Sequence, residues 1–346
     1  MTTPAIAIIA EDVPARGCQR AGTVPIAPAR VSTALMDALV RETGRRPRSL
    51  RRRALSGLRK ARLLVGDPTV VSDIDGRALA MPLSHDLPLH RAAHPDYSRN
   101  LGRAVAALQA ARPGAGVVDI GANVGDSVAI IRDAAPDTPI LCIEGDSHFL
   151  PFLEHNVRDL VDVEIAPVYV GHSAGDQGRG MSVVRAAGTA SLVERDDDSP
   201  NIGVSTQSLE AILAEHPGFA RPGMLKLDTD GHDADIVLQA EAVIRSARPV
   251  VFLEFDPPMA ARVGGVDPVA ALEFLHRLGY RRALVFANTG ALVAVLDGDT
   301  WLSEVARLAT RLGPARPVAY FDICVFAEVD LGVADELERL EGASSR

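Results

Sequence analysis

From about residue 100 onward, the chain alternates between short apolar segments and longer segments with helical periodicity. The apolar runs at residues 116–120, 140–143 and 249–254 are typical of strands that are buried on both faces. Strands that alternate with helices predict a parallel sheet covered by helices on both sides. We therefore expect an α/β fold with a doubly wound, mostly parallel sheet of seven strands.

The length of 346 residues allows one large α/β core and an accessory segment. We expect residues 1–99 to form an N-terminal extension with a basic helical stretch and a small β element. Residues 100–330 should form the main domain, with a hairpin in its polar, glycine-rich stretch before residue 200. We expect residues 331–346 to be a polar C-terminal tail.

Composition narrows the class of protein further. No apolar run approaches the roughly 20 residues that a membrane-spanning helix needs. The apolar start at residues 5–10 has no basic residue before it and runs into acids, so we expect a cytoplasmic protein without an export signal. Cys18, Cys142 and Cys324 are far apart and form no CxxC pair, which favours buried thiols over a disulfide or zinc site.

Residues 41–62 contain ten arginines and lysines and a single acid, Glu42. This stretch admits two interpretations: a surface for an anionic partner, such as an acidic carrier protein, a phosphorylated substrate or RNA, or a solvated helix face that pairs with acids elsewhere. We favour the second, because charge runs usually do no more than this. The net charge of −9 argues against nucleic-acid binding by the whole molecule.

Residues 117–126 place an acid and a glycine loop between a buried strand and a helix. Gly121 and Gly125 leave room for a ligand to approach the backbone, and Asp119 can accept a hydrogen bond from an ammonium or amide group. A dinucleotide fingerprint would need glycine where Asn123 stands, and Asp126 at the helix start would repel a phosphate. A neutral or cationic ligand fits better. S-adenosylmethionine carries an ammonium and a sulfonium.

Glu144 follows the next strand, one βα unit after the glycine loop. In a right-handed doubly wound sheet it would lie beside that loop, where a carboxylate can accept both ribose hydroxyls. The alternative is that Glu144 only caps the following helix, since acids are common at helix starts. Because Glu144 occurs together with the Asp119 loop, we favour the ligand interpretation.

These motifs resemble the FkbM-like methyltransferases, which methylate hydroxyl groups on polyketides, sugars and related natural products. The resemblance covers roughly residues 87–327 and rests on residues 119–125, 143–144, 225–231 and 252–254, with residues 94–101 similar to the segment that precedes the glycine loop in the family. It implies a Rossmann-like class I methyltransferase domain with S-adenosylmethionine as cofactor. The cofactor-binding residues that follow are Asp119, Gly121, Asn123, Gly125, Asp126, Glu144 and Tyr97.

Three departures from the family pattern affect the acceptor side. Gly145 stands where proline often follows the acid, Asp230 replaces a usual glutamate, and His232 and Asp233 follow Gly231 where a small residue and glutamate are more common. These changes leave the cofactor assignment intact. They concern the acceptor site and its base.

Residues 226–232 deliver charge to the carboxyl edge of the sheet, where open α/β proteins bind ligands. Lys226, Asp228 and Asp230 would share one side if the strand continued, and His232 follows closely. We take these four residues as the candidate catalytic group, with Asp228 or His232 as the base; an unperturbed imidazole titrates nearer neutral pH than a carboxylate. The alternative is a salt-bridged loop in which Lys226 and Asp228 neutralise each other.

Acids at two strand ends raise the possibility of a metal site. Asp228, Asp230 and Glu254 could supply oxygen ligands for magnesium, but no recognised metal-loop spacing is present, so we expect no required metal.

We expect an O-methyltransferase for a small hydroxylated acceptor, free or carrier-bound, in an undetermined oligomeric state. The alternatives are a non-catalytic protein that uses the same fold for binding or scaffolding, and a nicotinamide-dependent oxidoreductase, which lacks its phosphate loop here.

Overall fold

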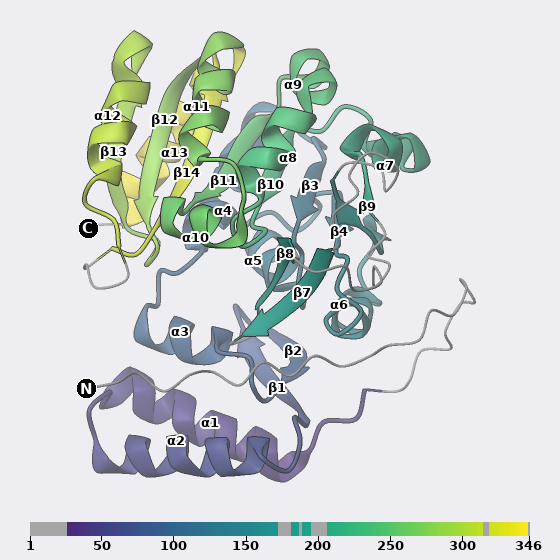
Figure 1. Cartoon of the computed structure of the whole chain (residues 1–346), viewed down its shortest axis with the longest axis vertical. Coiled ribbons are helices and arrows are strands. Elements are labelled where there is room, and N and C mark those ends of the chain that lie inside the picture. The colour runs from purple at the N-terminus through teal and green to yellow at the C-terminus, as the bar shows by residue number, and fades with distance from the viewer. Residues whose placement is uncertain (1–25, 172–180, 187–188, 195–205, 314–317, 345–346) are drawn as a thin grey trace.

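A central sheet with helices on both faces dominates the computed structural model, which describes residues 26–171, 181–186, 189–194, 206–313 and 318–344 (Figure 1). The sheet strands, in spatial order, are β13 (Leu292–Asp297), β12 (Tyr280–Ala287), β14 (Phe321–Ala327), β11 (Val250–Phe255), β10 (Met224–Leu227), β3 (Val117–Ile120), β4 (Ile140–Ile143) and β5 (Val163–Ala166). The fold class expected from the sequence is confirmed. The sheet has eight strands rather than seven, because the second arm of the β12–β13 hairpin joins it as an edge strand.

Strand direction changes at one point in the sheet. From β11 to β5 the neighbouring strands are parallel, whereas β14 runs antiparallel to both β11 and β12. The first residues of β14 therefore lie at the same edge as the last residues of β10 and β11. This edge carries polar side chains from β10, β11 and β14, and it is the place where open α/β sheets bind ligands.

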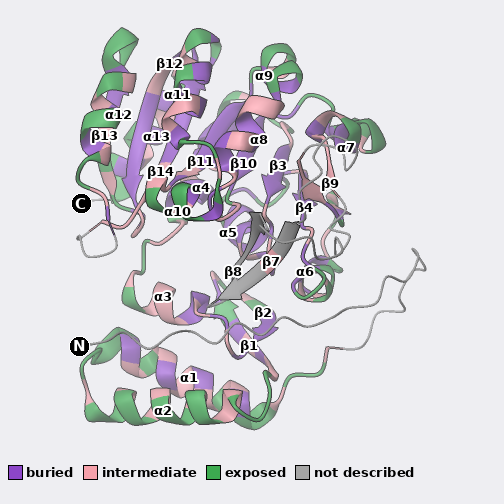
Figure 2. Cartoon of the chain, viewed as in Figure 1, coloured by how far each residue is buried: buried purple, intermediate pink, exposed green. Residues whose placement is uncertain are grey.

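Helices cover the two faces of the sheet with separate apolar clusters. One face is covered by α7 (Leu209–Glu215), α8 (Asp233–Gln239), α9 (Glu241–Ala247), α11 (Pro268–Arg277) and α12 (Trp301–Ala309). The other face is covered by α4 (Arg99–Ala111), α5 (Asp126–Ala134), α6 (Leu150–Val157) and α13 (Leu331–Ser344). Figure 2 shows the central strands as buried and the outer sides of these helices as exposed. Cys142 and Cys324 are buried free thiols, and Cys18 lies outside the described residues.

The remaining short elements lie around this core. They include the helix α10 (Pro257–Val263), the strand pair β6 (Tyr169–Val170) and β9 (Thr206–Gln207), and the hairpin of β7 (Met181–Ala186) and β8 (Thr189–Glu194). The β7–β8 hairpin falls in the polar, glycine-rich stretch where the sequence predicts one.

The N-terminal extension packs against the main domain through an apolar cluster of its own. It consists of α1 (Arg30–Arg45), α2 (Leu50–Leu63), β1 (Thr69–Ile74), β2 (Arg77–Pro82) and α3 (Leu87–Ala93). The predicted small β element is the antiparallel β1–β2 pair. Its cluster includes Met36 and Met81 together with Val124, Ala129 and Phe149 of the main domain. Asn156 joins the two parts, because its buried side chain bonds both backbone groups of Ala80 and the carbonyl of Val124.

The C-terminal segment is a helix and not the polar tail that we expected. In α13, Val333, Ala334 and Leu337 are buried against the sheet face that also carries α4. Arg103 of α4 forms an ion pair of 2.6 Å with Glu341, whose side chain is 4% exposed. The apolar residues are few and are diluted by charged residues on the opposite side, so composition alone concealed the amphipathic pattern.

This difference is directly testable by mutation of α13. Leu337→Ala should lower the free energy of unfolding by about 2–5 kcal/mol, because it leaves a cavity in a fully buried site. Glu338→Ala, on the exposed side of the same helix, should change it by less than about 0.5 kcal/mol. Urea denaturation followed by circular dichroism measures both. Equal stability of the two variants would mean that the segment is a dispensable tail.

Candidate active site

A buried ion pair lies beneath the carboxyl edge of the sheet. Lys226 and Asp119 are directly opposite each other in the parallel β10–β3 pair, so their side chains share one face of the sheet. Lys226 Nζ lies 2.9 Å from Asp119 Oδ1 and 3.4 Å from Asp228 Oδ2, and it donates to the carbonyl of Gly121 at 3.3 Å. Asp119 is completely buried, whereas the Asp228 side chain is 50% exposed.

Charge balance in this group keeps Lys226 protonated. Burial opposes the ammonium form, but the carboxylates of Asp119, Asp228 and Asp126 outweigh it and raise the pKa of Lys226 above its ordinary value. Lys226 therefore acts as a fixed positive charge and not as a proton acceptor. The salt bridge between Lys226 and Asp228 that the sequence allowed is present, although the partner nearest to Lys226 is Asp119 and not Asp228.

Gly121 allows the ends of β3 and β10 to meet. It has φ +82°, and a Cβ built there would lie 2.0 Å from the carbonyl oxygen of Asp228. A side chain at Gly121 would therefore first collide with the neighbouring backbone, before it reached the space for a ligand. Gly125 also has a positive φ, and it is the N-cap residue of α5. The glycine loop is therefore shaped by the contact between strands as well as by any ligand.

Glu144 is held with both carboxylate oxygens oriented. Its Oε2 accepts the backbone N–H of Asn123 at 2.8 Å, and its Oε1 accepts the backbone N–H of Asp146 at 2.7 Å. Helix α6 begins only at Leu150, so Glu144 does not cap it. Burial raises the pKa of Glu144 to about 7, opposed by the two backbone donors. The Glu144 carboxylate thus lies beside the glycine loop, and its role in binding ribose hydroxyls stays a prediction.

The residue after Glu144 explains one departure from the family pattern. A Cβ at Gly145 would lie 2.2 Å from the ring of Tyr169, so the ring packs directly on the glycine backbone. Proline, or any other residue with a side chain, would collide with that ring unless Tyr169 moved.

Asn123 connects the glycine loop to the N-terminal extension. His85 Nδ1 accepts the backbone N–H of Leu87, so the proton is assigned to Nε2, which donates to Asn123 Oδ1 at 3.2 Å. Burial lowers the pKa of His85 to about 4, so the imidazole is neutral at physiological pH. Asn123 itself has φ +48°, a conformation that asparagine tolerates better than most residues.

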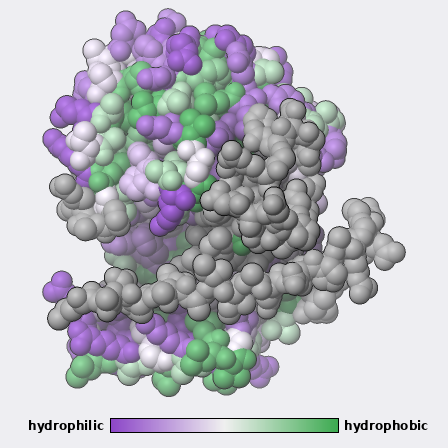
Figure 3. Space-filling view, in the orientation of Figure 1, coloured by the Kyte–Doolittle hydropathy of each residue, from purple (hydrophilic) through white to green (hydrophobic). Residues whose placement is uncertain are grey.

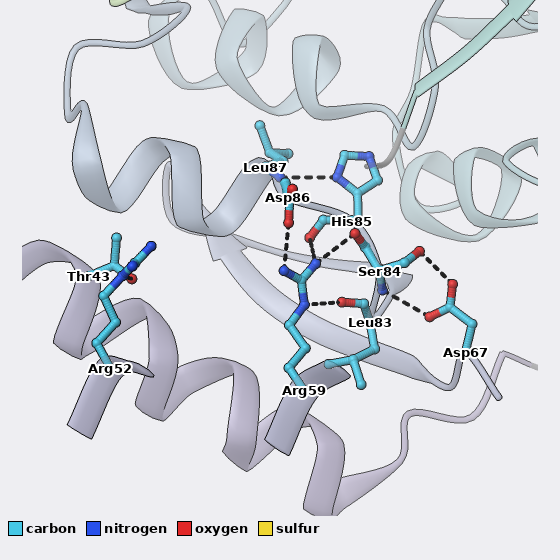
Figure 4. Close-up of polar contacts among 9 residues, drawn as sticks. All are labelled: Thr43, Arg52, Arg59, Asp67, Leu83, Ser84, His85, Asp86 and Leu87. Carbon is cyan, nitrogen blue, oxygen red and sulfur yellow. Dashed lines mark hydrogen bonds and ion pairs between the residues drawn. The ribbon is translucent and has the colours of Figure 1, made fainter. Parts of the chain in front are cut away.

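The loop that carries His85 is held by an arginine of the basic stretch. Arg59 of α2 donates to the carbonyl of Leu83 at 2.8 Å and to that of Ser84 at 2.6 Å, and it pairs with Asp86 at 2.6 Å (Figure 4). Sequence reasoning missed His85 and this role of Arg59. The only signal was the basic stretch itself, and a charge run does not show which arginine points inward.

A pocket opens at the carboxyl edge of the sheet, beside the buried ion pair. Its polar walls come from α5, from the ends of β10 and β11 and from the start of β14, and two tyrosines stand in its wall. The lining residues are Tyr97, Ser98, Leu101, Asp126, Ser127, Ile130, Lys226, Leu227, Asp228, Phe252, Glu254, Tyr320 and Asp322.

The pocket is rich in carboxyl groups. Glu254 and Asp322 are opposite each other in the antiparallel β11–β14 pair, and Asn100 donates to Asp322 at 3.4 Å. Burial, with neighbouring acids, raises the pKa of Asp126 to about 6, that of Asp322 to about 7 and that of Glu254 well above its ordinary value. Neighbouring carboxylates repel one another when they are ionised. A cationic ligand in the pocket would therefore stabilise the ionised forms of these acids.

The four candidate catalytic residues separate in the structure. Lys226 and Asp228 line the pocket, whereas Asp230 and His232 do not. Strand β10 ends at Leu227 and Asp230 has φ +52°, so the extended geometry that would have placed Asp230 beside Asp228 does not continue. The His232 Nδ1 atom lies 3.9 Å from Asp235 Oδ2 on the same helix start.

Of the predicted cofactor residues, Tyr97 and Asp126 line the pocket, and Asn123 and Glu144 are joined by a hydrogen bond. Sequence reasoning missed Tyr320 and Asp322, because β14 reaches this edge only through its antiparallel insertion between β11 and β12. Within the described residues, no group of three or more histidine, cysteine or acidic side chains could hold a metal ion, and the absence of a required metal stays a prediction.

Comparison with known proteins agrees with this geometry. Residues 119–282 match the model of the methyltransferase FkbM domain. The match spans just under half of the chain and contains Asp119, Glu144, β10 and Glu254, and the expected family resemblance is confirmed. S-adenosylmethionine is the cofactor that this domain implies.

Solved structures give weaker likenesses. A methyltransferase FkbM from Methylobacillus flagellatus is 15% identical with a TM-score of 0.32, and the likeness covers 48% of this chain and 36% of that one. A TehB-like methyltransferase dependent on S-adenosylmethionine, from Corynebacterium glutamicum, is 14% identical with a TM-score of 0.32 and coverages of 65% and 86%. This chain thus spans little more than a third of the Methylobacillus protein. No curated protein sequence matches the chain significantly.

The buried pair of Lys226 and Asp119 makes a prediction about stability. Lys226→Met should lower the free energy of unfolding by about 3–5 kcal/mol, because it leaves the Asp119 carboxylate buried without its partner. The double variant Asp119→Asn with Lys226→Met should recover part of that loss, since both charges are gone. Guanidinium denaturation of the two variants provides the comparison. A Lys226→Met protein as stable as the wild type would show that the pair has no structural role.

Proposed function

We propose that this chain is a cytoplasmic O-methyltransferase that transfers a methyl group from S-adenosylmethionine to a hydroxyl of a small natural product, such as a polyketide, a sugar or a related metabolite. The acceptor is either free or bound to a carrier. The observation that carries the proposal is the acid-lined pocket at the carboxyl edge of the sheet, with Asp228 in its wall and Glu144 fixed beside the adjoining glycine loop.

The residues present fit S-adenosylmethionine. Glu144 has two oriented oxygens that can accept ribose hydroxyls, and the glycine loop lies next to it. Asp126, Glu254 and Asp322 surround a pocket whose charge complements an ammonium or a sulfonium. A nicotinamide dinucleotide would instead bring its pyrophosphate to the start of α5, where Asp126 stands.

The chain's contribution to the reaction is orientation and removal of a proton. When bound, S-adenosylmethionine supplies a methyl group that is made electrophilic by the sulfonium. The pocket would align the acceptor hydroxyl with that methyl group, which is the main requirement for in-line displacement. Asp228 would take the hydroxyl proton as the oxygen–carbon bond forms and the carbon–sulfur bond breaks, leaving S-adenosylhomocysteine.

Asp228 is a better base than His232 in this geometry. Asp228 lines the pocket with half of its side chain exposed, while His232 lies outside the lining, near Asp235. Tyr97 and Tyr320 line the same pocket. Burial raises the pKa of each above its ordinary value, so both remain neutral hydrogen-bond donors.

Glu144 should control cofactor affinity in a pH-dependent way. Glu144→Gln should weaken binding of adenosine, which carries the ribose without the ammonium and sulfonium, by about 5- to 150-fold. The wild-type affinity should rise between pH 6 and pH 8, because the ionised carboxylate is the better acceptor and its pKa is raised to about 7. The variant should lose that rise. Calorimetric titration measures both effects.

The control for this experiment is Glu164→Gln. Glu164 is a half-exposed acid on the neighbouring strand β5 that pairs with His216. The Glu164→Gln protein should bind adenosine with the affinity of the wild type at every pH. Equal affinity of the Glu144→Gln protein and this control would place the ribose somewhere else.

The assignment of the base is tested by turnover, with radiolabelled methyl donor and an acceptor found by screening hydroxylated metabolites. Asp228→Asn should lower kcat by about 10²- to 10⁴-fold while S-adenosylmethionine affinity stays near that of the wild type, because the proton moves only in the chemical step. His232→Ala should keep near-normal turnover. The assignment fails if the Asp228→Asn protein turns over normally, or if the His232→Ala protein is the more impaired.

A further inference from the structure

The outward face of α2 is apolar, although the helix is strongly basic. Successive helical residues are about 100° apart, so the side chains that point away from α1 form one line along the helix. We call this line the outer stripe, and it consists of Leu50, Ala54, Gly57, Leu58, Ala61 and Leu64. All six residues are exposed; Leu50 is 81% exposed, Leu58 58% and Leu64 89%.

Basic residues border the outer stripe on both sides. The same helical spacing places Arg51 and Arg62 along one border and Arg53 and Lys60 along the other. The helix contains no acid. Arg59 points the opposite way, toward the loop that it holds, and its side chain is only 13% exposed. Arg51 and Arg59 pair with acids, as the sequence suggested, and the exposed side of the helix is in addition an apolar line between two basic borders.

The charge of this region opposes that of the rest of the chain. Residues 30–65 contain eleven arginines and lysines and two acids, whereas the whole chain has a net charge of −9. The other residues are therefore strongly acidic as a group. A negatively charged surface would attract the α1–α2 hairpin and repel the remainder, which would fix the orientation of the molecule.

The position of α2 allows contact with an extended surface. In Figure 1, α2 lies along the lower boundary of the molecule, and no described element extends beyond it there. Figure 3 shows hydrophobic and hydrophilic side chains side by side along this boundary. Val31, at the start of α1, and Val65, just after α2, are 85% and 84% exposed and add apolar area to the same hairpin.

We propose that α2 binds the surface of a membrane containing anionic lipids. The outer stripe would enter the boundary between headgroups and acyl chains, and the basic borders would contact the anionic headgroups, as in interfacial amphipathic helices. A fluid surface can cover a stripe with alternating large and small residues without matching its shape, which favours lipid over a folded protein partner. No helix among the described residues is long and apolar enough to cross a bilayer, so this is peripheral attachment.

The test is sedimentation of the full chain with vesicles of phosphatidylcholine alone and with added phosphatidylglycerol. The wild type should bind the anionic vesicles and lose binding as salt is raised. Leu50→Gln with Leu58→Gln, and separately Arg53→Gln with Lys60→Gln, should each weaken binding at least about tenfold. Both variants should keep wild-type affinity for S-adenosylhomocysteine, because neither change touches the cofactor site.

Matched controls change the same kinds of residue elsewhere. Val161→Gln with Val329→Gln alters two apolar residues that are 75% and 77% exposed, and Arg245→Gln with Arg307→Gln removes two exposed charges from the main domain. Both should bind vesicles as the wild type does. Absence of vesicle binding at low salt would overturn the proposal. So would a wild-type dimer that the leucine variant converts to a monomer, since the stripe would then be covered by a second copy.

Discussion

The ion pair between Lys226 and Asp119 connects the sheet to the site above it. Both residues are buried near the carboxyl ends of their parallel strands, where an unpaired charge would be very costly. The pair brings the ends of β3 and β10 together, and Gly121 permits their backbones to meet. Asp228 then leaves the sheet directly beside the glycine loop. The position of the proposed base and the shape of the proposed cofactor loop thus have one physical origin.

The N-terminal extension contributes to the same loop from outside the matched domain. Arg59 fixes the loop after β2, His85 bonds the side chain of Asn123, and the backbone of Asn123 bonds Glu144. The extension therefore supports the proposed cofactor site, because hydrogen bonds connect α2 to Glu144, the proposed ribose acceptor. In our proposal for α2, the inward side of the helix supports the enzyme and its outward side meets a membrane surface.

The sequence predicted the parts of the fold that depend on local pattern. Apolar runs located the strands, and glycines at residues 121 and 125 with Glu144 located the proposed cofactor edge, because these signals lie close together in the chain. It did not predict the contribution of Asp322, which reaches the pocket through the antiparallel strand β14, or that of His85, which comes from another part of the molecule. Such contacts depend on tertiary packing. The helix α13 was missed because three buried apolar residues in a charged segment give a weak periodic signal.

The central claim is that S-adenosylmethionine binds at the carboxyl edge of this sheet, between the glycine loop and the acid-lined pocket. The most direct test is a crystal structure of the full chain with S-adenosylhomocysteine. Our account predicts that both ribose hydroxyls contact the carboxylate of Glu144 and that the ammonium lies among the acids of the pocket, with Asp228 left facing the acceptor side. A ligand bound elsewhere, or one whose ribose makes no contact with Glu144, would contradict it.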